Sequence, residues 1–133
     1  MFLKFILRSM INKILLIDDD DIFQLTASKI LKKVYPQLEI FSAKNGEEAL
    51  NQLVDQPTDL DLILLDINMP IMNGWEFLDA YASKEFKNEI PIYVLSSSID
   101  PNDKEKADSN PKVIGFIEKP LSFAKARQLN TAS

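Results

Sequence analysis

The chain has 133 residues, enough for one domain with a single hydrophobic core, with little room for a second domain. It contains no cysteine and no histidine, which excludes disulfides, thiolate and imidazole metal sites, and catalytic triads that use these side chains. The net charge of -5 argues against nucleic-acid binding, because proteins that bind a phosphate backbone concentrate lysine and arginine on one face. Any reactive site must therefore be built from carboxylate, hydroxyl and amine groups.

The first ten residues are mainly apolar and carry the cations Lys4 and Arg8. These cations interrupt the apolar run and no small-residue cleavage site follows, so a signal peptide is not favoured. We predict an extension over residues 1–10 and one domain over residues 11–131, with Met10 as a second candidate start. A hydrophobic fraction of 46% is ordinary for a globular protein and argues against a membrane protein. The absence of cysteine suits a reducing compartment, and we expect the cytoplasm.

Apolar runs then alternate with helical patterns along the rest of the chain. Residues 14–17 are a continuous aliphatic run bounded by charge, which is typical of a strand buried on both faces. Apolar residues next recur at near-helical spacing until Tyr35 and Pro36 end the pattern, and Asn45-Gly46 and Pro57 mark the limits of the following helix. We predict strands at 14–17, 38–43, 60–65, 90–95 and 112–117, and helices at 20–34, 47–54, 75–82, 101–109 and shortly after Pro120.

This alternation predicts a series of βα units, and such a series forms a parallel sheet covered by helices on both faces. The expected fold is a doubly wound, flavodoxin-like α/β domain with five strands and five helices. In open parallel sheets the functional crevice lies beyond the carboxyl ends of the strands, so polar residues that follow the strands are expected to meet at one rim. These residues are Asp18 to Asp21, Asp66, Ser96 to Ser98, and Lys119.

Several carboxylates at one rim repel one another and lose hydration, so such a site favours a divalent cation with oxygen ligands. We expect Mg²⁺, because the run Asp18 to Asp21 lacks the spacing and the glycine of a calcium loop. A carboxylate can also attack phosphorus when positive charge neutralises the phosphoryl oxygens. Asp66 is the candidate nucleophile, and the metal and Lys119 are the candidate sources of that charge. We expect the Ser96 hydroxyl to help orient the phosphoryl oxygens.

Four blocks of the chain together resemble the receiver domain of two-component response regulators. The resemblance covers most of the chain, and four blocks in order on a fitting βα background are far more specific than one. The blocks are Lys13-Ile14-Leu15-Leu16-Ile17-Asp18-Asp19-Asp20, Asp66-Ile67-Asn68-Met69-Pro70 with Gly74, Leu95-Ser96-Ser97, and Phe116-Ile117-Glu118-Lys119-Pro120.

The resemblance implies a role for individual residues of these blocks. The implied metal is Mg²⁺, for which Mn²⁺ can substitute. The switch hydroxyl is a serine here, where the family more often has threonine, and three serines stand together at that place. The implied roles are phosphoacceptor and metal ligand for Asp66, metal ligands for Asp18, Asp19 and the Asn68 backbone carbonyl, phosphate binding for Lys119, switch hydroxyl for Ser96, and switch aromatic for Phe116.

The resemblance also implies a stand-alone signalling domain rather than an enzyme, with only its own phosphoryl transfer and autodephosphorylation as chemistry. The implied donor is a sensor histidine kinase or a histidine phosphotransfer protein. An unknown downstream protein would read a shape change through the surface of the segments 101–109 and 112–117 and the last helix. No nucleic-acid or membrane partner is expected. The segment Asp108 to Pro111 replaces the glycine-bearing turn usual in the family, which bears on this output surface.

Other functions fit parts of the pattern. A receiver-like scaffold that only binds partners is the first alternative, and the loss of an acid or of the lysine would mark it. A metal-dependent aspartyl phosphohydrolase is less favoured, since that family needs a second acid where Asn68 stands. A flavin-binding electron carrier is disfavoured because aspartates occupy the place of its phosphate-binding loop. Phe116 is also a candidate core residue, and Asp20 and Asp21 are candidate helix-start residues.

Overall fold

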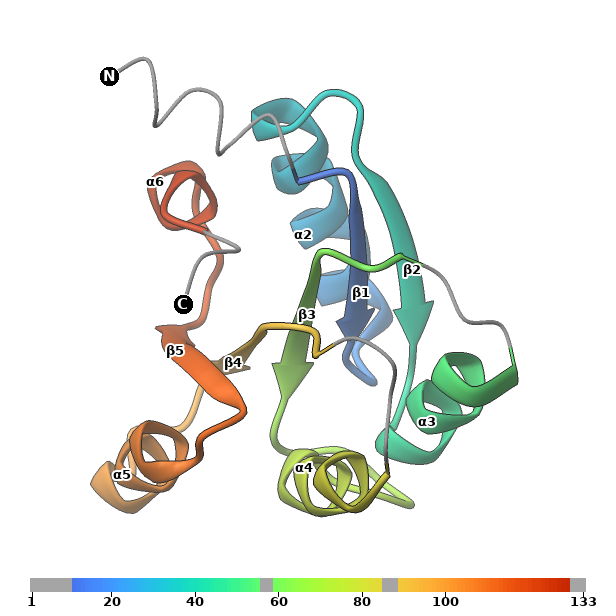
Figure 1. Cartoon of the computed structure of the whole chain (residues 1–133). Coiled ribbons are helices and arrows are strands. Elements are labelled where there is room, and N and C mark those ends of the chain that lie inside the picture. The colour runs from blue at the N-terminus through green and yellow to red at the C-terminus, as the bar shows by residue number, and fades with distance from the viewer. Residues whose placement is uncertain (1–10, 56–58, 85–88, 130–133) are drawn as a thin grey trace.

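The computed structural model describes residues 11–55, 59–84 and 89–129, so the predicted extension over residues 1–10 and Pro57 lie outside the described residues. Within this part, five strands form one parallel sheet in the order β2-β1-β3-β4-β5 (Figure 1). The strands are β1 (Lys13–Ile17), β2 (Glu39–Ala43), β3 (Leu62–Asp66), β4 (Ile92–Ser96) and β5 (Val113–Glu118), and the helices are α2 (Asp21–Val34), α3 (Gly46–Asp55), α4 (Gly74–Ser83), α5 (Pro101–Ser109) and α6 (Phe123–Arg127). The predicted doubly wound α/β fold is confirmed.

The central strands β1 and β3 are aliphatic and buried on both faces, as the sequence predicts. They pair in parallel, with Ile14 opposite Leu62 and Ile17 opposite Leu65. Strand β3 begins at Leu62, two residues later than predicted, because the carboxylate of Asp61 accepts hydrogen bonds from the backbone N–H groups of Asn12 and Lys13. Asp61 therefore ties the turn before β3 to the start of β1 instead of extending the strand.

Helices cover both faces of this sheet, and successive strand residues alternate between the two cores. Leu16 and Leu64 face a core that includes residues of α2 and α6, whereas Leu15 and Leu65 face one that includes residues of α3 and α4. The Tyr35 hydroxyl, which is buried, donates a hydrogen bond of 2.7 Å to the carbonyl oxygen of Ala126 and so joins α2 to α6.

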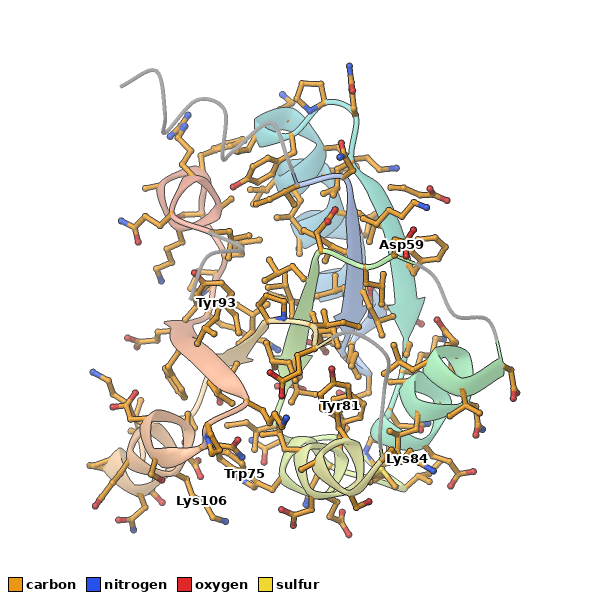
Figure 2. The ribbon with its side chains drawn as sticks, viewed as in Figure 1. Asp59, Trp75, Tyr81, Lys84, Tyr93 and Lys106 are labelled. Atoms are coloured by element: carbon orange, nitrogen blue, oxygen red, sulfur yellow. The ribbon has the colours of Figure 1, made fainter. Side chains whose placement is uncertain are left out.

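Helix α5 has little apolar surface, yet it forms where the sequence predicts a weak helix. The Asp100 carboxylate caps it by accepting from the N–H of Asn102, and Pro101 occupies the first turn. Ala107 packs into a small core against Ile67 and Val94. Figure 2 shows Lys106 beside Trp75 of α4, with the ammonium 4.9 Å from a ring centroid. Capping and tertiary packing thus compensate for the weak amphipathic pattern.

The loop from Ile67 to Asn73 folds back tightly after β3. The Gly74 N–H donates to the Ile67 carbonyl at 2.8 Å, and a Cβ atom at Gly74 would lie 2.5 Å from the backbone oxygen of Asp66. Ile71 has a φ of 68°, the one positive φ of a non-glycine residue among those described, although its side chain is 74% exposed. The loop therefore needs a glycine at one position and carries backbone strain at another.

Replacing Gly74 with alanine is expected to lower the free energy of unfolding by about 1–3 kcal/mol, because the new Cβ collides with backbone that has no room to move. Gly46→Ala is the matched control, since it also lies at the first position of a helix and its Cβ meets mainly the flexible side chain of Met72. Urea denaturation of both variants measures the difference. Equal losses in the two variants would contradict the close approach at Gly74.

Replacing Ile71 with asparagine is expected to raise the free energy of unfolding by about 1 kcal/mol, because asparagine tolerates the left-handed region that a β-branched residue resists. Little burial is lost, since Ile71 is largely exposed. Ile99→Asn is the control, because Ile99 is 90% exposed and has no positive φ. Thermal denaturation of the two variants tests this. If Ile71→Asn is no more stable than Ile99→Asn relative to the wild type, the backbone at Ile71 is not strained.

Candidate functional site

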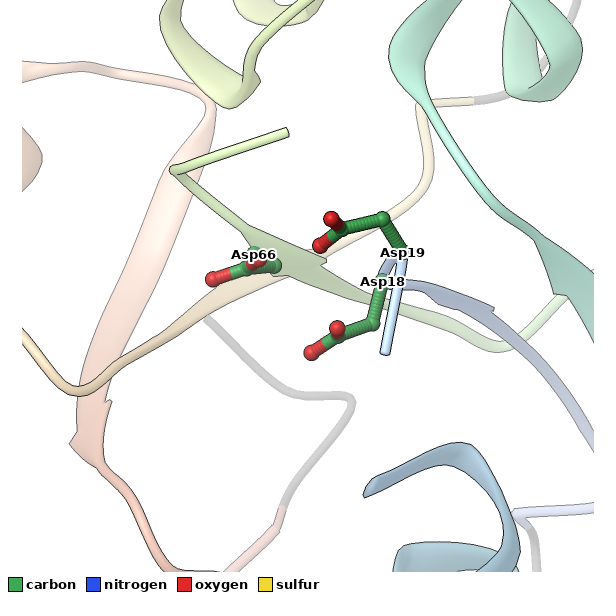
Figure 3. A group of neighbouring side chains, drawn as sticks. All are labelled: Asp18, Asp19 and Asp66. Atoms are coloured by element: carbon green, nitrogen blue, oxygen red, sulfur yellow. The ribbon is translucent and has the colours of Figure 1, made fainter. Parts of the chain in front are cut away.

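Three carboxylates from two neighbouring strand ends converge at the rim of the sheet (Figure 3). Asp18 and Asp19 follow β1 and Asp66 ends β3, and one oxygen from each of the three lies within 4.8 Å of the others. The side chains of Asp18 and Asp66 are buried, with 1% and 6% of the residue exposed, whereas Asp19 is exposed. The cluster is thus open to solvent on one side and held rigidly on the other.

The pairing of the strands explains this convergence. Since Ile17 lies opposite Leu65 in the parallel register, the residues that follow them, Asp18 and Asp66, emerge side by side at the carboxyl ends. The backbone of Asp18 donates to the Ala43 carbonyl at 2.9 Å, and its Oδ1 accepts from the N–H of Asp20. Asp18 is therefore fixed by hydrogen bonds at both its backbone and its side chain.

Lys119 is the cation that faces this cluster. Its Nζ lies 2.7 Å from Oδ2 of Asp18 and 3.5 Å from Oδ1 of Asp66, and its side chain is 16% exposed. The backbone N–H of Lys119 donates to the carbonyl of Ser96 at 2.9 Å, and the peptide bond to Pro120 is cis. The lysine thus reaches two acids that are 101 and 53 positions away from it in the sequence.

The site holds more negative than positive charge. Burial raises the pKa of the Asp66 carboxyl from its ordinary value of 3.8 to about 6, and the negative charge of Asp18 adds to the rise. Lys119 and the backbone N–H of Ile67 act in the opposite direction without cancelling it. The ammonium of Lys119 is therefore insufficient to neutralise the negative charge of the three acids. Their hard oxygen donors suit a small divalent cation such as Mg²⁺.

Ser96 lies at the same rim, but its hydroxyl is engaged elsewhere. It ends β4 and is fully buried, and its Oγ accepts a hydrogen bond of 3.0 Å from the N–H of Ser98. The Ser98 hydroxyl in turn donates to the Asp103 carboxylate at 2.5 Å. Among the described residues, the structure brings Asp18, Asp66 and Lys119 into contact, while Ser96 meets this group through its backbone.

The remaining predicted site residues lie near the rim in different environments. Asn68 is exposed in the loop after β3. Phe116 of β5 is half-buried and packs against Ile67, Val94 and Ala107, so it contributes to a core whatever else it does. Asp20 caps α2, as expected of a helix-start residue: its carboxylate accepts a hydrogen bond from the N–H of Ile22 at 2.9 Å.

Two residues at this rim were not predicted from the sequence. The amide of Gln24 donates to the backbone carbonyls of Leu16 and Asp18 at 3.1 Å and of Ala43 at 3.3 Å, and so fastens α2 to two strand ends. The ring of Phe23 lies under the ammonium of Lys119, with 4.1 Å between the nitrogen and the ring centroid. The only sequence signal for Phe23 is an aromatic residue in the first turn after the acidic run.

No helix among residues 11–55, 59–84 and 89–129 combines the length and the hydropathy that crossing a membrane requires.

Comparison with known proteins identifies the family of the chain. A family model described as the response regulator receiver domain matches residues 14–130. A two-component response regulator of Arabidopsis thaliana is 34% identical over 110 residues, which are 82% of this chain and only 18% of that protein. A solved two-component response regulator from Cytophaga hutchinsonii is 36% identical, with a TM-score of 0.78 over 86% of this chain and 90% of that chain. The solved phosphorylated cyanobacterial phytochrome response regulator is 28% identical, with a TM-score of 0.75 over 88% and 86%.

The family match begins one residue inside β1 and covers the other described strands and helices in full, including the acids and the lysine at the rim. The sheet order, the parallel register and the solved relatives agree with this assignment. The chain therefore belongs to the family of response regulator receiver domains of two-component systems.

Proposed function

We propose that Asp66 accepts a phosphoryl group and that the domain transmits this event to another protein by a change of shape. One observation carries the proposal: a buried carboxylate at the end of β3 lies beside two further acids and a lysine whose ammonium is 3.5 Å from it. This arrangement fits an acid that reacts with a phosphoryl group while fixed charges neutralise the phosphoryl oxygens. The functional domain would be residues 11–131, in the cytoplasm.

Asp18, Asp19 and Asp66 would hold a divalent cation, Mg²⁺ or Mn²⁺, with the backbone carbonyl of Asn68 as a further ligand. The oxygen donor set and its surplus negative charge support this part of the proposal. When bound, the ion would supply positive charge against the carboxylates and the phosphoryl oxygens. Because magnesium keeps several waters, the exposed side of the cluster at Asp19 suits it.

The residues of the chain would share the work of the transfer. An oxygen of the Asp66 carboxylate forms a bond to phosphorus, while the bond from phosphorus to the donor breaks and its electron pair leaves with the donor. Lys119 would donate hydrogen bonds to the phosphoryl oxygens, because its ammonium is already close to Asp66. Water would later cleave the acyl phosphate, and the rate of this hydrolysis would set how long the phosphorylated state lasts. The domain would thus act as a signalling protein rather than as an enzyme.

The change of shape would begin at Ser96. Its hydroxyl now accepts from Ser98, and turning toward a phosphoryl oxygen would draw the segment between β4 and α5 with it. Phe116 packs in the small core with Val94 of β4 and Ala107 of α5, the two elements that this segment joins, and would adjust its position there. A sensor histidine kinase or histidine phosphotransfer protein would supply the phosphoryl group, and a downstream protein would read the surface of α5, β5 and α6.

Incubation with acetyl phosphate and Mg²⁺ is expected to add one phosphoryl group to the wild type and none to Asp66→Asn, because an amide is a far weaker nucleophile than a carboxylate. Asp79→Asn, an exposed acid on α4, is the control and is expected to react like the wild type. Intact-mass spectrometry measures the gain. A wild type inert with every small donor and with candidate kinases would favour a scaffold that only binds partners.

In metal-free buffer at pH 7.5, the free energy of unfolding of Asp66→Asn is expected to be about 1–3 kcal/mol higher than that of the wild type. The pKa of Asp66 is higher in the folded protein, about 6 against 3.8, so ionisation costs stability above pH 6. This cost disappears as the pH falls from 6 toward 4, where the wild type should approach the variant. Urea denaturation at several pH values tests this, and a difference independent of pH would contradict the raised pKa.

A further inference from the structure

We propose that Phe23 is a positioning residue for Lys119, and that the face of its ring holds the ammonium where it meets a phosphoryl group on Asp66. This inference rests on the proposed function of Asp66 and adds to it a residue outside the acids, hydroxyl and lysine at the rim. The observation that carries it is the placement of the Lys119 nitrogen 4.1 Å from the centroid of the Phe23 ring.

The ammonium lies between two kinds of partner. On one side it contacts the carboxylates of Asp18 at 2.7 Å and Asp66 at 3.5 Å, and the other contact is the aromatic ring. A cation this close to a ring face is attracted by the negative face of the π-system, and the attraction grows as water is excluded. The side chain of Lys119 is only 16% exposed, so much of that water is already excluded.

The ring itself is held in place by the start of α2. The Asp20 carboxylate accepts from the N–H of Phe23 at 3.2 Å, which fixes its backbone in the first turn. Gln24, the next residue, binds three carbonyls at the ends of β1 and β2 and fastens this turn to the sheet. The Phe23 side chain is half-buried and packs against the core that faces α2 and α6. The ring is therefore a fixed surface for a flexible lysine.

A ring face suits this position because it attracts the ammonium without accepting strong hydrogen bonds from it. A third carboxylate would accept hydrogen bonds from the ammonium and compete with an incoming phosphoryl group. The ring attracts the cation but leaves its N–H groups free to donate, so Lys119 can move its hydrogen bond from Asp18 to a phosphoryl oxygen without leaving the ring.

The alternative is that Phe23 only fills space in the core. The two accounts differ in one property, since core packing depends on the size of the ring and the cation contact depends on the electron density of its face. Successive fluorine substitution withdraws that density with little change in size. It therefore separates positioning of the lysine from packing.

The test places phenylalanine with one, two or three ring fluorines at position 23 of the full chain, beside Phe23→Leu and Phe23→Tyr. The rate of phosphorylation by acetyl phosphate and the dissociation constant of Mg²⁺ are measured for each. The ring-current shift of the Lys119 ε-methylene is followed by NMR in metal-free protein. The same fluorinated residues at Phe41, which packs against the opposite core, are the control series.

The rate is expected to fall stepwise with fluorination, by about three- to tenfold at three fluorines and in Phe23→Leu, while Phe23→Tyr stays within about twofold of the wild type. The Mg²⁺ dissociation constant should change by less than about twofold, and Phe23→Leu should lose the upfield shift at Lys119. A rate that is indifferent to fluorination, or an equal fall in the Phe41 series, would overturn the proposal and leave packing as the explanation. A wild type that takes up no phosphoryl group would instead refute the function proposed for Asp66, and the role of Phe23 with it.

Discussion

The parallel pairing of β1 with β3 is the constraint on which the rest of the site depends. It places two acids, Asp18 and Asp66, side by side and largely out of water, where burial and the negative charge of Asp18 raise the cost of ionising Asp66. Hydrophobic packing on both faces of the sheet holds this arrangement, since β3 and all of β1 after Lys13 are buried. The site therefore exists at the expense of stability, and under the proposed function a cation and a phosphoryl group would relieve its unfavourable charge.

The elements around the rim fix each group separately. Gln24 holds the first turn of α2 to the ends of β1 and β2, and Gly74 lets the loop after β3 pass close to the backbone of Asp66. Ser96 is connected through Ser98 to Asp103 of α5, so a movement of its hydroxyl has a direct route to that helix. Rigid acids beside a hydroxyl that is linked to a helix with one buried residue are what the proposed switch would use.

Much of this arrangement could be predicted from local sequence. The sequence located all five strands to within two residues. The signal is clearest for β1 and β3, because a strand buried on both faces has few alternatives to Val, Ile and Leu. The topological rule for parallel sheets then brought Asp18, Asp66 and Lys119 to one edge, and the structure places these three in contact. The roles implied for Phe116 and Asn68, and the switch role of Ser96, came from the family resemblance, and for these residues the structure supplies only their surroundings.

What the sequence did not predict depends on contacts between distant segments or on single dihedral angles. Gln24 looks like any polar residue of an exposed helix until three strand-end carbonyls surround its amide, and nothing in the identity of Ile71 indicates a positive φ. Phe23 did not stand out from the apolar residues around it, and only the return of the chain 96 positions later brings Lys119 over its ring. Periodicity indicates which face of a helix is buried. It does not indicate which buried side chain will meet a charge, because that depends on the partner rather than on the helix.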